Sequence, residues 1–127
     1  MSAKEWKRIA EREARRYREH RAFVKGVRDA GSPGTERSRA SERWVLAVDY
    51  VLDYLHRTDP EKERFMRSYL NLDGSRRTKR SSIVALSLAC CTSTSTVYAW
   101  RSELLSLLVI AATQTGAIVP YETKPTR

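Results

Sequence analysis

A run of small hydroxyl residues divides the most apolar part of the chain into two segments. Residues 91–96 read Cys-Thr-Ser-Thr-Ser-Thr. Serine and threonine side chains accept hydrogen bonds from free backbone amides at helix starts, whereas inside a helix they compete with the backbone. We therefore expect one helix to end near Cys90 and a second helix to begin after an N-cap at about Ser93.

The segments on both sides of this run have the spacing of apolar residues that is typical of helices. Before it, Ile83, Leu86 and Cys90 lie three and four positions apart, after a serine cap at positions 81–82. After it, residues 94–112 place apolar side chains on a single helical face. These side chains are Val97, Trp100, Leu104, Leu108 and Ala111. Two helices joined in this way by a short turn predict a helix-turn-helix.

Two further helices are expected before this unit. The first would begin after an N-cap at Ser41 and bury a stripe of apolar residues. The stripe consists of Trp44, Val45, Val48, Val51, Leu52 and Leu55. The second would begin at a capping box of Thr58 and Glu61, with Pro60 in its first turn, and end at the turn sequence of residues 71–74. Its buried residues would be Phe65, Met66, Tyr69 and Leu70.

The N-terminal part of the chain predicts a basic helix followed by a linker. Residues 2–29 carry a thin apolar stripe surrounded by charged side chains. The first 40 residues hold half of the 24 basic residues but only six of the 15 acidic ones. Ion pairs along the helix and contacts to phosphate explain this charge equally well. Residues 30–40 concentrate glycine, proline and serine, which disfavour helix.

Together these elements predict an all-α fold, a small helical domain with a C-terminal helix-turn-helix and a basic N-terminal helical arm. A chain of 127 residues has room for one compact domain and an arm. We expect the arm, the linker, the helix-turn-helix domain and a tail to occupy residues 1–29, 30–40, 41–118 and 119–127.

The formal net charge of +9 would draw the chain to polyanions. Nucleic acid is favoured over a membrane, because the most apolar stretch, residues 104–112, falls short of the roughly 20 apolar residues that a span needs. The N-terminus lacks the apolar core of a secretory signal, so we expect a cytoplasmic protein. Cys90 and Cys91 are expected to be free thiols, since adjacent cysteines pair only with strain. With His20 and His56 isolated, no metal or other cofactor is expected.

Two sets of residues are candidates for DNA contact. Four cations lie within five residues just before the helix-turn-helix, where they would bind phosphates. They are Arg76, Arg77, Lys79 and Arg80. The second helix of such a unit lies in the major groove, where hydroxyl groups and arginine in its first turns reach base edges and phosphates. The candidates there are Thr94, Ser95, Tyr98, Arg101 and Ser102. For each candidate the alternative is an ordinary solvated side chain.

Three segments resemble the ArpU/RinA family of phage late-gene transcriptional regulators, which are similar to the fourth conserved region of bacterial sigma factors. Residues 58–69 resemble the acidic, proline-started helix before the family's motif, and residues 76–90 occupy the place of its first motif helix. Residues 95–101, Ser-Thr-Val-Tyr-Ala-Trp-Arg, resemble the start of its recognition helix. The resemblance covers residues 44–118. It implies sequence-directed binding to double-stranded DNA, regulation of late genes and recruitment of host RNA polymerase.

Two other functions stay open. One is the recognition subunit of a phage DNA-packaging motor, like a small terminase, which also combines a small helix-turn-helix with an oligomerising region. The other is a protein-interaction or inhibitory module that binds an acidic partner. The broad apolar surface of residues 104–110 is compatible with a homodimer. An enzyme is not expected, because the sequence shows no Ser-His-Asp set, P-loop or metal-ligand pattern.

Overall fold

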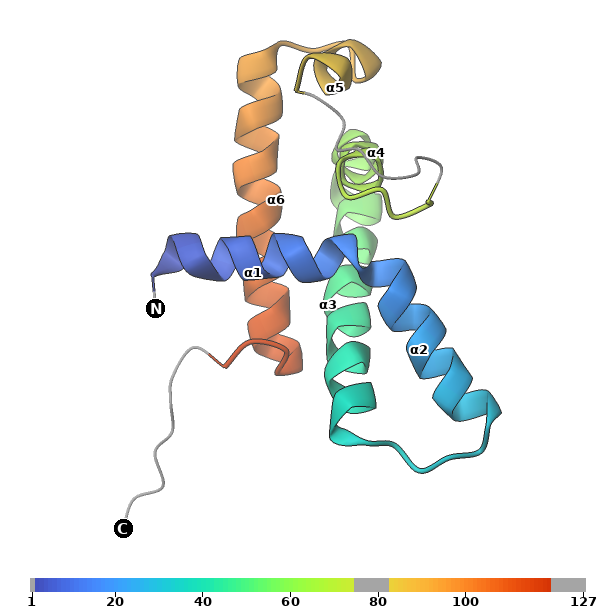
Figure 1. The fold of residues 1–127 in the computed structure, drawn as a ribbon. Helices are drawn as coiled ribbons and strands as arrows, with labels where there is room; N and C mark the ends of the chain where they lie inside the picture. Colours follow the sequence, from blue (N-terminus) through green and yellow to red (C-terminus); the bar gives the residue numbers. More distant parts are fainter. Residues whose placement is uncertain (1, 75–82, 120–127) are drawn as a thin grey trace.

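The computed structural model describes residues 2–74 and 83–119 of the chain (Figure 1). These residues form six helices and no strand, which confirms the predicted all-α fold. The helices are α1 (Ala3–Arg15), α2 (Tyr17–Asp29), α3 (Glu36–Thr58), α4 (Pro60–Tyr69), α5 (Ile83–Ala89) and α6 (Thr94–Thr115).

The two longest helices, α3 and α6, pack against each other and form the centre of the molecule (Figure 1). α1 crosses α6, α2 packs along α3, and α5 packs against the first part of α6. The buried side chains of α6 lie on more than one side of that helix, because it has neighbours on several sides. They are Val97, Leu104, Leu105, Leu108, Ala111 and Ala112. Four of the five side chains that we expected on the inner face of this helix are therefore buried, and the fifth, Trp100, is half-buried.

The basic N-terminal segment, which the sequence predicted as an arm, packs on α3 and α6. The chain also bends at Arg16, which divides the expected single helix into α1 and α2. Ala10 and Ala14 are completely buried, because their small side chains let α1 lie close to its neighbours. On α2, the Tyr17 hydroxyl donates a hydrogen bond to the Asp49 carboxylate of α3. Burial and this bond raise the pKa of Tyr17 to about 12.

The third helix begins earlier than the sequence predicted. α3 starts at Glu36 after an N-cap at Thr35, whose hydroxyl oxygen accepts a hydrogen bond of 3.1 Å from the Ser38 amide. The linker is therefore shorter than residues 30–40. Ser41, the expected N-cap, lies inside the helix, where its buried hydroxyl is 2.9 Å from Nδ1 of His20. A tertiary contact of this kind leaves no periodic signal in the sequence.

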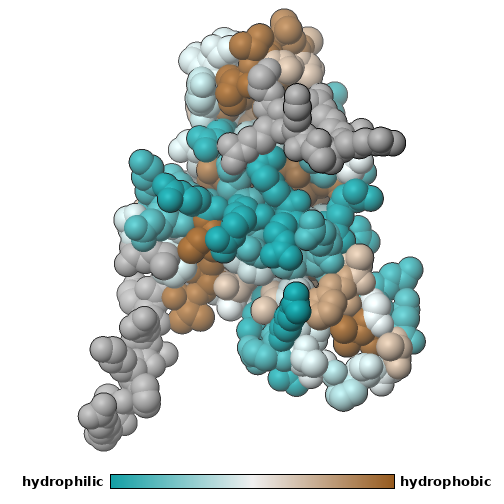
Figure 2. All heavy atoms as spheres, viewed as in Figure 1, coloured by the Kyte–Doolittle hydropathy of each residue, from teal (hydrophilic) through white to brown (hydrophobic). Residues whose placement is uncertain are grey.

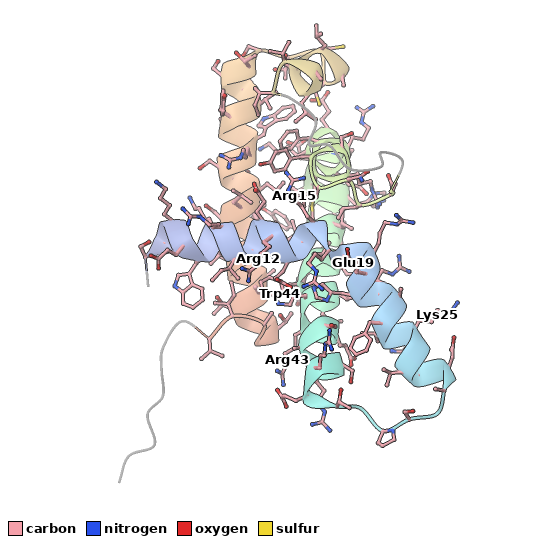
Figure 3. All side chains as sticks on the ribbon, viewed as in Figure 1. Arg12, Arg15, Glu19, Lys25, Arg43 and Trp44 are labelled. Atoms are coloured by element: carbon pink, nitrogen blue, oxygen red, sulfur yellow. The ribbon has the colours of Figure 1, made fainter. Side chains whose placement is uncertain are left out.

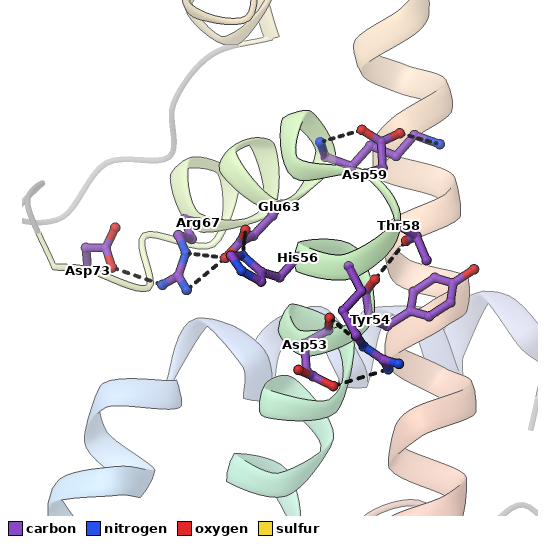
Figure 4. Close-up of polar contacts among 10 residues, drawn as sticks. Asp53, Tyr54, His56, Thr58, Asp59, Glu63, Arg67 and Asp73 are labelled. Atoms are coloured by element: carbon purple, nitrogen blue, oxygen red, sulfur yellow. Dashed lines mark hydrogen bonds and ion pairs between the residues drawn. The ribbon is translucent and has the colours of Figure 1, made fainter.

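The junction between α3 and α4 uses a different cap from the predicted one (Figure 4). The carboxylate of Asp59 accepts a hydrogen bond of 3.3 Å from the Lys62 amide, so Asp59 is the N-cap of α4. The Thr58 hydroxyl instead donates a bond of 2.7 Å to the Tyr54 carbonyl of α3. Pro60 occupies the first turn, as expected. Aspartate and threonine both cap helices well, and the sequence did not separate the two neighbours.

None of the described helices is, by itself, both long and apolar enough to cross a membrane. α5 and α6 together meet that length and composition, but the chain bends by 99° between them.

Candidate nucleic-acid interface

α5, the turn after it and the first part of α6 lie at one end of the molecule, and we call α5, this turn and α6 the α5–α6 unit (Figure 1). The two helices meet at 99°. Helices that cross at about 90 to 120° through a turn of a few residues have the general geometry of a helix-turn-helix. Cys91 adopts a left-handed conformation with φ 53°, and the amide of Thr92 donates a hydrogen bond of 3.0 Å to the Ser87 carbonyl. This bond closes the end of α5.

The start of α6 is fixed by Ser93, as the sequence predicted. The Ser93 hydroxyl oxygen accepts a hydrogen bond of 3.2 Å from the Thr96 amide, and the residue has the extended backbone of an N-cap. The hydroxyl also lies 3.1 Å from the Ser95 hydroxyl and 2.9 Å from that of Thr96. The hydroxyl run thus ends one helix and begins the next.

Replacing Ser93 by alanine is expected to lower the free energy of unfolding by about 1 kcal/mol, because the Thr96 amide loses its acceptor. Thermal or urea unfolding measures this loss. Ser102→Ala is the control, since the Ser102 side chain is exposed and lies more than two turns into α6, away from the cap. Equal stability of the two variants would contradict the assignment of Ser93 as the cap.

Four of the five candidate residues on α6 are exposed in its first turns. They are Thr94, Ser95, Tyr98 and Ser102. At about 100° per residue, these positions fall within roughly 100° of the helix circumference, so they share one face. The Tyr98 side chain is 56% exposed. We call this surface the α6 recognition face; it offers hydroxyl donors and acceptors and one aromatic ring to a partner.

Arg101, the fifth candidate, is engaged inside the molecule. Its Nε donates a hydrogen bond of 2.6 Å to the Tyr69 hydroxyl of α4, and its Nη2 lies 3.6 Å from a carboxylate oxygen of Glu11 on α1. The bond to Tyr69 raises the pKa of the Arg101 guanidinium above its ordinary value. The Tyr69 hydroxyl also donates a hydrogen bond of 2.5 Å to the Glu11 carboxylate, and both residues are buried. Arg101 therefore links α6 to α4 and α1, although its side chain is 39% exposed.

Arg15 completes this group, and Figure 3 shows it near the end of α1, beside α4. Its Nη1 donates a hydrogen bond of 2.8 Å to the Tyr69 carbonyl, and its Nε lies 3.9 Å from Glu11. Sequence reasoning missed the role of Glu11 and Tyr69. Glu11 is 90 positions from Arg101 in the chain, and no local spacing connects them.

The inner side of the α5–α6 unit rests on α4. The ring of Trp100 packs edge-on against Phe65, with 5.8 Å between ring centroids and an interplanar angle of 68°. Phe65 in turn stacks on Tyr69 at 5.5 Å. These contacts fix the position of α6 relative to α4 and leave the recognition face outward. The four predicted loop cations, Arg76, Arg77, Lys79 and Arg80, lie outside the described residues.

A serine, a histidine and a carboxylate do meet in space, although no spacing in the sequence predicts this contact. Nδ1 of His20 lies 2.9 Å from the Ser41 hydroxyl, and Nε2 lies 2.9 Å from the Glu13 carboxylate. Ser41 and His20 are both only 7% exposed. A nucleophile must reach its substrate, so this buried chain fits a structural link between α1, α2 and α3 better than a catalytic site.

Cys90 is half-buried and Cys91 is exposed, and both are free thiols. Burial raises the pKa of the Cys90 thiol above its ordinary value, which disfavours the reactive thiolate. Within residues 2–74 and 83–119, no three histidine, cysteine, aspartate or glutamate side chains lie close enough together to hold a metal ion.

Comparison of the chain with protein-family models, curated proteins and solved structures finds no match. Its function must therefore be inferred from the residues and their geometry.

Proposed function

We propose that this protein binds double-stranded DNA, with the α5–α6 unit acting as a helix-turn-helix. The observation that carries the proposal is the recognition face at the start of α6, which projects at one end of the molecule beside the perpendicular α5. The major groove is about 12 Å wide and accepts one helix. Hydroxyl groups there bond to bases or phosphates, and a threonine methyl group contacts thymine.

The charge of the chain supports the same partner. A net charge of +9 attracts a phosphate backbone and speeds association with it. None of the four residues of the α6 recognition face is a cation. Arg101, which lies next to this face, is bound to Tyr69 and Glu11. We therefore expect phosphate contacts from other parts of the surface to provide most of the affinity, with a modest sequence preference from α6.

The resemblance to phage late-gene regulators makes transcription the process that we propose for this binding, with host RNA polymerase as a second partner.

A homodimer fits an exposed groove of about 330 Å³ between α3 and α6. Tyr50, Tyr54 and Ile110 on this groove are 61%, 45% and 56% exposed. Asp53 and Arg57 beside it pair at 3.2 Å. A locally neutral apolar surface is where two copies of a cationic chain can meet with least repulsion.

Binding to a labelled pool of random duplexes tests the proposal, with fluorescence anisotropy as the readout at several salt concentrations. The logarithm of affinity should fall linearly with the logarithm of salt concentration, with a slope that counts the neutralised phosphates. Sequencing of the bound fraction after selection gives the preferred site. A chain that binds no duplex even at low salt would overturn the proposal.

The mass of the protein in solution separates the two DNA-related functions. A monomer or dimer that protects a promoter fits regulation, whereas a ring-sized oligomer fits a packaging subunit. The interaction module would be favoured instead if the chain binds no duplex but binds an acidic protein with an affinity that does not fall as salt rises.

A further inference from the structure

The recognition face of α6 and helix α1 lie on the same side of the molecule. Tyr98, Leu105 and Ala112 are seven residues apart, about two helical turns, so they point in nearly the same direction. Their exposed fractions are 56%, 5% and 0%. Exposure on this side of α6 therefore ends where α1 crosses it (Figure 1). A duplex seated on the first turns of α6 would meet α1 next.

The ion pair between Glu11 and Arg101 shows which side of α1 is turned toward the start of α6. Arg101 lies on α6 between Tyr98 and Leu105, and Glu11 reaches it across a distance of 3.6 Å. Residues three, four and seven positions from Glu11 share its helical face. Toward the N-terminus these residues are Arg8, Lys7 and Lys4. We call these three residues the α1 basic row.

The α1 basic row is free to meet an anion. Within the part of the chain that the structure describes, none of its members forms an ion pair. Lys4 and Arg8 are exposed and Lys7 is half-buried. The one carboxylate on this face, that of Glu11, is already bonded to Tyr69 and paired with Arg101. Figure 2 shows hydrophilic residues gathered in a band over α1 on this side.

We propose that the α1 basic row is a second DNA contact, which binds backbone phosphates beside the major groove entered by α6. This inference rests on the proposed function and adds the path of the duplex to it. Lysine and arginine at phosphates fix the position and orientation of a protein on DNA but read no sequence. The α6 recognition face would then supply base contacts, while α1 supplies affinity.

The other basic surface of the molecule is a poorer candidate and serves as a control. Arg18, Arg21, Lys25 and Arg28 of α2 line a groove together with the acidic residues Asp29, Glu42 and Asp49. The carboxylates would repel a phosphate backbone. Lys25 lies on α2, away from α1 and α6 (Figure 3).

The double variant Lys4→Ala/Arg8→Ala tests the inference against Lys25→Ala/Arg28→Ala, which removes the same charge from α2. We expect the first pair to flatten the salt slope by about two and to weaken duplex binding about tenfold or more, equally for all sequences. The second pair should leave the slope unchanged. All four side chains are exposed, so both double variants should unfold at nearly the same temperature as the unchanged protein. Lys4→Arg/Arg8→Lys keeps both positive charges and should therefore keep the original salt slope.

The outcomes separate this inference from the proposed function. If the unchanged protein binds no duplex, both fail. If it binds, and the two alanine pairs alter the slope equally or not at all, α1 does not lie on the phosphates while DNA binding stands. A slope that flattens only for the α1 pair supports the contact.

Discussion

Replacing Tyr98 by glutamate is expected to weaken DNA binding about tenfold or more while changing stability by no more than about 0.5 kcal/mol. Tyr98 is 56% exposed at the centre of the α6 recognition face, so the new side chain would project outward without disturbing the core. In the complex its carboxylate would face the phosphates that border the groove, and like charges repel there. Anisotropy with a selected duplex measures the effect.

Thr113→Glu is the matched control, because it adds the same charge to an exposed position near the other end of α6. Fifteen residues separate the two positions, or about 22 Å along the helix. The control should bind duplex nearly as well as the unchanged protein at moderate salt, where charges that far apart are screened. Similar losses in both variants would remove Tyr98 from the interface and leave only the effect of net charge.

The parts of the fold that follow from local chemistry were predictable. The hydroxyl run before Val97 gave the end of α5, the cap at Ser93 and the start of α6 at Thr94. These features depend on residues within a few positions of one another. The apolar spacing in α3 and α6 likewise predicted the faces on which they pack.

The parts that depend on distant residues were not predictable from a pattern. Ser41 has the character of a cap, yet its hydroxyl bonds to His20 across the interface between α2 and α3. The stripe around Ala10 and Ala14 was too thin to distinguish an arm from a docked helix. Small side chains permit close packing, but they contribute little apolar area to a sequence pattern.

The candidate site divides in the same way. Exposure of Tyr98 and Ser102 follows from their positions opposite the apolar stripe of α6. The engagement of Arg101 follows instead from Glu11 and Tyr69, which reach it from two other helices. An arginine in a sequence does not indicate whether its partner is a phosphate or a buried carboxylate, because both groups accept hydrogen bonds from the guanidinium.

Replacing Glu11 by alanine should lower the free energy of unfolding by about 2 to 4 kcal/mol, because two guanidinium groups and a buried hydroxyl lose their carboxylate. Glu11 is 7% exposed, accepts a hydrogen bond from Tyr69 and lies within 4 Å of Arg15 and Arg101. Urea unfolding measures the loss. Glu19→Ala is the control, since Glu19 pairs with Arg16 at the surface and exposed pairs contribute only about 0.2 to 1 kcal/mol.

Glu11→Gln keeps an acceptor for Tyr69 while removing the charge, so its stability should fall between those of the alanine variant and the unchanged protein. A loss for Glu11→Ala no larger than that for Glu19→Ala would show that the group around Tyr69 does not hold α1 to α6. Arg101→Ala then decides whether that arginine also meets DNA. Where both variants remain folded, weaker duplex binding by Arg101→Ala than by Arg15→Ala requires a contact that the network alone does not supply, since both variants remove one positive charge from the group around Glu11.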